Sequence, residues 1–332
     1  MRKARLGFAV MAAGSAAAAR ESWVQTLVLV RSLRRFGGEH GRGPVLVLFP
    51  DTEGRRAGDL EARVEREGAE ILPVSLDPET LGFPFAAKVA AAAVAEERLL
   101  GRADALFWMD PDTLVLSDLA GLVPGGATDL CYRPVHITNV GSRFDEPVDP
   151  FWAAIYSGCH VAEEAFFPME TCVEGAKVRP YLNAGCLVVR PEKGILRAWA
   201  ERFSELRGTP ALESFYTKDR RYAIFVHQAV LAGTVLATVG RPRMRELPES
   251  VNYPRHLHET YDAARRPKRL NDLVTCRYEE SFPVNRWESD LLPVDEPLLS
   301  WIRDQLLDVE PLLDSERTAR LRAELDLEGI RV

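Results

Sequence analysis

The first 110 residues alternate between short apolar runs and longer segments of helical character. The apolar runs predict strands over residues 6–13, 45–49, 70–74 and 105–109. The segments between them are periodic or rich in alanine and predict helices over residues 21–36, 59–67 and 86–100. Nearly continuous apolar strands separated by helices are typical of a parallel sheet covered on both faces. We therefore expect an α/β fold with a mostly parallel sheet flanked by helices, which binds ligands at the carboxyl ends of its strands.

The rest of the chain is less regular. Strands are predicted over 129–134 and 187–189, and helices over 150–157, 193–206, 222–231, 298–309 and 315–327. Residues 138–180 form a predicted insertion, and residues 241–287 predict mostly irregular structure. No repeat or linker divides the chain, so we expect one domain over residues 1–290, with halves at 1–135 and 136–290. A helical extension is expected over 291–332, and its last helix is expected to pack on the body or form a homodimer contact.

The amino-terminal segment allows two interpretations. Arg2, Lys3 and Arg5 precede the apolar stretch Leu6–Ala13, and alanines follow it. A basic start, an apolar middle and small residues after it are the pattern of a signal peptide. The same apolar stretch also fits a buried first strand, and the strand–helix–strand unit would be incomplete without that strand. We favour the strand.

Composition narrows the class of protein. The 332 residues include 42 Lys and Arg and 49 Asp and Glu, for a net charge of −7, so a broad nucleic-acid surface is not expected. Five cysteines, an odd number without a C-x-x-C pair, indicate reduced thiols and a cytoplasmic location. The sequence contains no run of about 18 apolar residues, so no integral membrane segment is expected.

Two carboxylates follow the last apolar strand of the first half. Asp110 and Asp112 are two residues apart, so in an extended backbone they point the same way, and Pro111 limits how far they can splay. A solvated turn is the alternative interpretation of this pair. Apolar residues flank it on both sides, which argues against such a turn. Hard oxygen ligands at such an edge suit Mn²⁺ or Mg²⁺. Unpaired charge at a buried edge is costly, which favours a functional pair.

This stretch resembles the D-x-D signature of GT-A fold nucleotide-sugar glycosyltransferases, most closely glycosyltransferase family 8, which includes glycogenin-like and lipopolysaccharide galactosyltransferase-like enzymes. Three further segments are similar to that family's motifs and occur in the family's order. They are Phe85–Lys88 with the helix after it, Tyr181–Val189, and His227–Leu231 followed by Leu247–Tyr253. The resemblance implies a GT-A catalytic domain and transfer of a sugar from a nucleoside diphosphate sugar, a UDP-sugar first among them. The acceptor (a sugar, lipid or protein) is not specified.

The resemblance also implies roles for individual residues. Asp110 and Asp112 would hold Mn²⁺ or Mg²⁺ on the diphosphate, where the ion acts as a Lewis acid. Lys88 would assist binding of phosphate or sugar. The sugar pocket would be lined by Asn183, Ala184 and Gly185. Gln228 lies where the family carries a residue near the anomeric carbon, and it is the candidate catalytic residue.

The chain departs from the family's pattern at the third metal ligand. The family has a histidine there, but residues 273–287 contain none, and Cys276 or Arg277 stands at about that place. An arginine there would neutralise phosphate directly and loosen the need for tight metal binding, so Arg277 is a candidate substrate-binding residue. His256 and His258 are the nearest histidines. One of them could be a metal ligand, or both could be surface residues of a loop. The acidic residue that usually precedes the family's glutamine is also replaced, by His227.

Two other functions remain open from the sequence. A catalytically impaired protein that only binds a nucleotide or sugar is consistent with the missing histidine. A sugar-phosphate nucleotidylyltransferase would carry a G-x-G-x-R loop after the first strand, which Ala12–Ser15 does not supply.

Aromatic residues of the insertion form either an acceptor site or a hydrophobic sub-core. These are Phe151, Trp152, Tyr156, Phe166 and Phe167.

Overall fold

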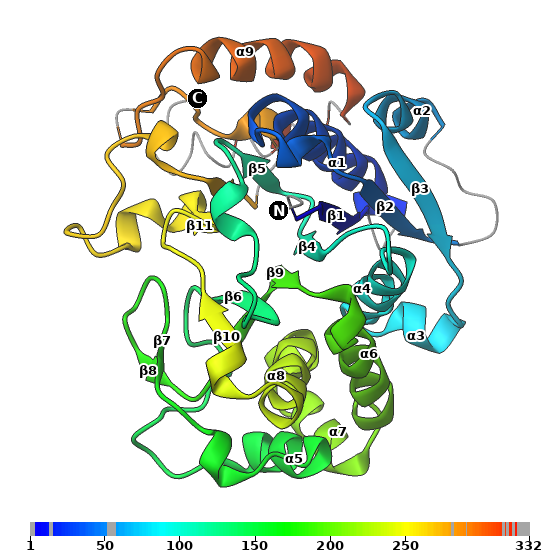
Figure 1. Cartoon of the computed structure of the whole chain (residues 1–332), viewed down its shortest axis with the longest axis vertical. Helices are drawn as coiled ribbons and strands as arrows, with labels where there is room; N and C mark the ends of the chain where they lie inside the picture. The colour runs from blue at the N-terminus through cyan, green and yellow to red at the C-terminus, as the bar shows by residue number, and fades with distance from the viewer. Residues whose placement is uncertain are drawn as a thin grey trace.

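A seven-stranded sheet forms the centre of the protein (Figure 1). The computed structural model describes residues 4–12, 16–51, 58–279, 282–289 and 291–313, with residues 316, 319, 320 and 323. The strand order is β10-β6-β9-β4-β1-β2-β3. The strands are β1 (Leu6–Met11), β2 (Val45–Pro50), β3 (Ala69–Val74), β4 (Ala105–Met109), β6 (Leu130–Pro134), β9 (Leu182–Val189) and β10 (Met244–Glu246). Only β9 runs antiparallel to its neighbours, so the prediction of a mostly parallel α/β sheet is confirmed.

Helices cover both faces of this sheet. On one face lie α1 (Ala16–Phe36), α2 (Asp59–Arg66) and α9 (Leu298–Val309). On the other lie α4 (Ala86–Arg98), α5 (Pro150–Cys159), α6 (Ile195–Leu206) and α8 (Arg220–Thr238). Two shorter helices, α3 (Pro78–Gly82) and α7 (Pro210–Tyr216), flank α4 and α8.

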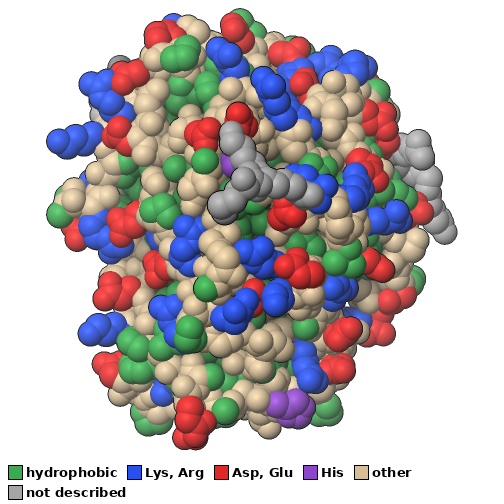
Figure 2. Space-filling view, in the orientation of Figure 1, with side chains coloured by type: hydrophobic (Ala, Val, Ile, Leu, Met, Phe, Trp, Pro, Cys, Tyr) green, Lys and Arg blue, Asp and Glu red, His purple; other side chains and the backbone are tan. Residues whose placement is uncertain are grey.

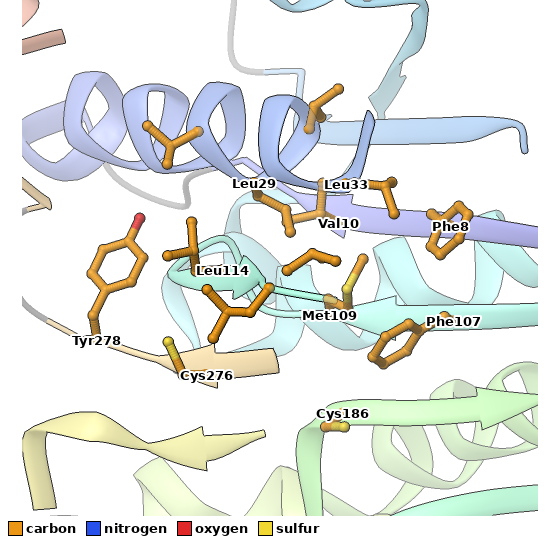
Figure 3. Close-up of a cluster of buried hydrophobic side chains, with 14 of the residues drawn as sticks. Phe8, Val10, Leu29, Leu33, Phe107, Met109, Leu114, Cys186, Cys276 and Tyr278 are labelled. Carbon is orange, nitrogen blue, oxygen red and sulfur yellow. The ribbon is translucent and has the colours of Figure 1, made fainter. Parts of the chain in front are cut away.

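The alternation of side chains along the central strands divides the core in two. Phe107 and Met109 of β4 belong to one cluster with Phe8 and Val10 of β1 and with Leu29 and Leu33 of α1 (Figure 3). Trp108, between them in the sequence, belongs to the cluster under α4, α6 and α8. A strand that is buried on both faces must be apolar at every position, which explains the continuous run in the sequence.

The insertion contributes to the second core cluster. Phe151, Trp152 and Tyr156 lie on α5 and are at most 5% exposed. Each packs against other aromatic rings of the same cluster. The sub-core interpretation therefore holds for these three residues, and they are not available to stack on an acceptor sugar.

Some boundaries differ from the sequence prediction. α8 continues to Thr238 rather than ending at residue 231. Gly233 does not break the helix, because it lies where α5 packs closely, and a Cβ there would be 2.7 Å from Cys159 Sγ. The strand predicted over 187–189 is longer and begins at Leu182, as the antiparallel strand β9. The helix predicted over 315–327 lies outside the described residues except for single positions, so the homodimer contact stays a prediction.

A second, three-stranded sheet has the order β11 (Tyr253–Pro254), β12 (Thr275–Arg277) and β5 (Thr113–Val115). A separate hairpin joins β7 (Met169–Glu170) to β8 (Lys177–Val178). The sequence prediction missed the small sheet, since its strands have two or three residues each. It places residue 277 opposite residue 113, directly after the two carboxylates.

The start of α6 is capped by a side chain from α4. Glu96 is fully buried, and its carboxylate accepts hydrogen bonds from the backbone N–H groups of Leu196 (3.1 Å) and Arg197 (3.0 Å). Groups at a helix start have no partner within the helix. We expect Glu96→Ala to lower the free energy of unfolding by about 2 kcal/mol in urea titrations, because buried donors lose their acceptor. Exposed Glu97→Ala is the control, and an equal loss in both variants would contradict this role.

Candidate active site

The two carboxylates lie in a tight connection between β4 and β5. Asp110 follows the last residue of β4, and its N–H donates to Gly185 O at 3.1 Å. The N–H of Thr113 then donates back to Asp110 O at 3.2 Å, which closes a turn around Pro111. Asp112 is 5% exposed. The prediction that this pair follows a buried strand is therefore confirmed.

Lys88 approaches Asp110 from the first turn of α4. Its Nζ lies 2.5 Å from Asp110 Oδ1, and the two side chains are 12% and 16% exposed. Burial alone would raise the pKa of Asp110, but the charges of Lys88 and Arg277 lower it to about 2. Lys88 thus belongs to the site, and it does not extend its charge into solvent.

Arg277 reaches the pair from the opposite side. Its Nη1 lies 2.9 Å from Asp110 Oδ2, and its Nε lies 2.7 Å from Asp112 Oδ1. Burial lowers the pKa of Arg277, but the charges of Asp112 and Asp110 outweigh it and raise the pKa above its ordinary value. The remaining oxygen, Asp112 Oδ2, accepts a hydrogen bond from the N–H of Glu279 at 3.1 Å.

The arrangement does not fit the predicted Mn²⁺ or Mg²⁺ ion. Each of the four carboxylate oxygens of Asp110 and Asp112 already faces a cation or a backbone N–H. Within the described residues, no group of three or more His, Cys, Asp or Glu side chains could hold a metal ion. Of the two residues expected near the third ligand's place, Cys276 is buried in the core, and Arg277 brings its cation to the carboxylates.

The predicted sugar-pocket residues lie beside this cluster on β9. Asn183 Oδ1 accepts a hydrogen bond from Gly185 N at 2.9 Å. Gln228, on α8, accepts one from Ala184 N through its Oε1 at 3.2 Å. The structure therefore brings Gln228 and the three β9 residues to the edge of the sheet that carries Asp110.

Gly185 lies against the ion pairs. A Cβ at this position would overlap Asp110 Oδ2 and lie 2.9 Å from Arg277 Nη1. Only glycine leaves space for the carboxylate there.

We expect Gly185→Ala to lower the rate of sugar transfer about tenfold, because Asp110 must rotate away from its two cations, and small misplacements in a site are costly. Steady-state kinetics measures the loss. Gly126→Ala is the control, since a Cβ there meets nothing within 4 Å. A Gly185→Ala variant as active as this control would show that the close approach has no catalytic role.

Phe85 and His227 stack on each other next to Lys88. Phe85 is 46% exposed, adopts a φ of 59°, and stacks on the His227 ring at 4.4 Å between centroids. Lys88 Nζ is 5.7 Å from the Phe85 centroid. Burial and the charge of Lys88 lower the pKa of His227 to about 3, so its ring is neutral at neutral pH. The replacement of the family's acidic residue by His227 thus adds no charge.

The sequence analysis missed one polar group at this edge. His136 Nε2 lies 3.1 Å from Asn252 O, and its ring centroid lies 6.2 Å from that of His256. His256 Nε2 is in turn 3.4 Å from a carboxylate oxygen of Glu279. Burial and the charge of Arg277 lower the pKa of His136 to about 3. The available signal was that His136 follows β6, which runs parallel to β4 and ends at the same edge.

The two candidate histidines of the loop are separated by the fold. His256 lies beside Glu279, close to the carboxylates, whereas His258 is buried against Tyr253, whose hydroxyl is 2.8 Å from its Nδ1. Of the two, only His256 belongs to the site.

The outer surface agrees with the mixed composition. Acidic and basic side chains are interspersed over the viewed face, with Lys and Arg more frequent across its middle (Figure 2). Of the helices in the described ranges, none combines the length and the apolar character needed to cross a membrane.

Comparison with solved structures finds distant similarities. The galactosyltransferase LgtC in complex with donor and acceptor sugar analogues is 15% identical with a TM-score of 0.48, covering 94% of this chain and 96% of that one. An active-site mutant of LgtC is 14% identical with a TM-score of 0.47, and the match covers 85% of this chain and 90% of that one. The glycosyltransferase GlyE of Streptococcus pneumoniae TIGR4 is 15% identical with a TM-score of 0.43, and the match covers 99% of this chain and 66% of that one. No curated protein matches the chain.

Comparison with protein families gives one match that covers most of the chain. Residues 17–235 match the Rhodobacterales glycosyltransferase domain. The match includes Lys88, Asp110, Asp112, the β9 residues and Gln228, and it ends before Arg277. The chain therefore belongs to the Rhodobacterales glycosyltransferase family, and the prediction of a glycosyltransferase is confirmed.

Proposed function

We propose that this glycosyltransferase takes its sugar from a nucleoside diphosphate sugar, with a UDP-sugar as the first candidate. The observation that supports this donor is the convergence of two buried cations, Lys88 and Arg277, on one sheet edge. A diphosphate carries the charge that such a pair can bind, and guanidinium groups recognise phosphate through paired hydrogen bonds.

In the reaction, the bond from the anomeric carbon to the diphosphate breaks, and an acceptor hydroxyl oxygen bonds to that carbon. The nucleoside diphosphate leaves with the electron pair, and the hydroxyl releases its proton. Lys88 and Arg277 stabilise the negative charge that develops on the leaving group. Asp110 and Asp112 hold these cations in place before the donor binds.

The β9 segment and α8 would form the sugar side of the site. Gly185 leaves room for the Asp110 carboxylate beside this strand, and Asn183 and Ala184 precede it on the same strand. Gln228 lies at the anomeric side in this arrangement, held by its hydrogen bond to the N–H of Ala184. The acceptor would be a sugar, a lipid or a protein.

We also infer a reducing compartment, consistent with the cytoplasm. All five cysteines lie in the described residues, and each is buried and free. Disulfides form and persist in oxidising compartments, so buried free thiols support a reducing one.

A thermal-shift panel tests the donor class. UDP, GDP, ADP, CDP and TDP are compared with their nucleosides, because a ligand at 100 times its Kd stabilises the native state by about 2.7 kcal/mol. We expect one nucleoside diphosphate and its sugar conjugates to raise Tm, and the nucleoside to have little effect. Release of that diphosphate from the conjugate then separates a transferase from a protein that only binds. If no nucleoside diphosphate stabilises the protein, the proposal is wrong.

A further inference from the structure

We propose that the guanidinium of Arg277 takes the place of a divalent cation, so that this enzyme binds its nucleoside diphosphate without a metal ion. The inference rests on the proposed function and specifies how that site meets the diphosphate.

The first argument is the occupancy of the carboxylate oxygens. A divalent ion such as Mg²⁺ binds lone pairs of carboxylate oxygens at about 2.0–2.1 Å. Here Asp110 uses Oδ1 for Lys88 and Oδ2 for Arg277, and Asp112 uses Oδ1 for Arg277 and Oδ2 for the Glu279 N–H. Each oxygen keeps a second lone pair, but a metal bound there would have to share the oxygen with the cation or N–H that already contacts it.

The second argument is charge. Two carboxylates and two cations, Lys88 and Arg277, make this cluster neutral. All four side chains are at most 16% exposed, so water screens them little. A divalent ion would enter beside two fixed positive charges and would be repelled by both.

The third argument is that the backbone fixes Arg277. β12 pairs antiparallel with β5, with Arg277 opposite Thr113, the residue after Asp112. The N–H of Tyr278 donates to Asp112 O at 3.2 Å, which extends the pairing by one step. The sheet therefore fixes the backbone of residue 277 beside the carboxylates, and the ion pairs with Asp110 and Asp112 hold the guanidinium there.

The fourth argument is the capacity of the side chain. The ion pairs with Asp110 and Asp112 use Nε and Nη1. A guanidinium has five N–H donors in a planar fork, so others remain to bind phosphate oxygens. Arg277 can thus hold the carboxylates and a diphosphate together, as a bridging metal would.

Calorimetric titration tests the proposal on the full chain. The probe is the nucleoside diphosphate that binds best in the thermal-shift panel, titrated with EDTA and separately with 1 mM Mn²⁺, about the level of a weak site. We expect the two Kd values of the unaltered protein to agree within about twofold, because no metal ion takes part in binding. Donor turnover should resist EDTA equally, and Mn²⁺ alone should give no saturable binding.

Arg277→His supplies the contrast, because a neutral imidazole beside two carboxylates makes a metal-binding set. We expect this variant to bind the diphosphate weakly in EDTA and at least tenfold more tightly with Mn²⁺. Arg277→Lys keeps the charge without the fork, and should bind about tenfold more weakly while remaining insensitive to EDTA. Arg102→His, at an exposed ion pair with Glu70, is the control and should behave as the unaltered protein.

The outcomes separate the two proposals. If the unaltered protein binds the diphosphate only with Mn²⁺, Arg277 does not replace the metal, but the donor class stands. If it binds no nucleoside diphosphate under either condition, the donor class fails and this inference fails with it. Neither result depends on whether the Arg277 variants fold.

Discussion

Lys88→Met should lower kcat/KM for the sugar nucleotide by about 10²–10³-fold, the usual effect of removing one preorganised group that stabilises charge on a leaving group. The side chains are similar in length, so the change removes mainly the positive charge. Lys88 Nζ lies 2.5 Å from Asp110 Oδ1 in a largely buried site, where such a charge acts with little screening. The measurement is steady-state kinetics of transfer, or of donor hydrolysis if the acceptor is unknown.

Lys193→Met provides the matched control. Lys193 also faces an aspartate, with its Nζ 3.8 Å from Asp129 Oδ1, but its side chain is 42% exposed. We expect its kinetics to match those of the unaltered protein. We expect Lys88→Met to fold, because Asp110 keeps its pair with Arg277. A folded Lys88→Met variant with full activity would remove Lys88 from the mechanism.

Asp112→Ala should lower the free energy of unfolding by about 3–5 kcal/mol, the range for breaking a buried ion pair from one side. Asp112 is the partner of Arg277 Nε and also accepts the hydrogen bond of Glu279 N. Its loss leaves the buried guanidinium with Asp110 alone, and leaves a backbone donor without its acceptor. Urea unfolding followed by circular dichroism measures the change.

Asp308→Ala is a demanding control for this prediction. Asp308 pairs with two arginines, Arg31 and Arg63, but its side chain is 43% exposed. Exposed pairs contribute about 1 kcal/mol or less, so we expect a small loss. The loss for Asp112→Asn should lie between those for Asp112→Ala and Asp308→Ala, because asparagine keeps an oxygen for Glu279 N but lacks the charge that pairs with Arg277. Similar losses for Asp112→Ala and Asp308→Ala would show that burial does not set the strength of the pair.

Much of the central sheet can be predicted from the sequence. The strands around β1 and β4 are visible as continuous apolar runs because both of their faces are covered by helices, and local composition records that burial. Asp110 and Asp112 stand out for the same reason, as charges placed directly after such a strand. The shared edge of parallel strands then follows from topology.

The predictions were weaker wherever one residue has to be placed by a partner far along the chain. β12 and β5 have three residues each, and such short strands show no periodicity. The helix predicted over 222–231 was too short, because the packing of Gly233 against α5 is invisible in the sequence of α8. The metal was predicted from the carboxylate spacing and the family resemblance, and neither reveals which cations lie nearby.

The sequence by itself determined the α/β class, the helix and strand that carry Lys88 and Asp110, and the chemical character of the site. These depend on local periodicity and on which residues tolerate burial, and both are properties of short segments. Only the tertiary structure decided that Arg277 faces Asp110 and Asp112, and that Lys88 closes the cluster from α4. That decision depends on the register of β12 against β5, where residue 277 meets residue 113. Pairing over such a separation is set by the packing of the whole domain, and no local pattern encodes it.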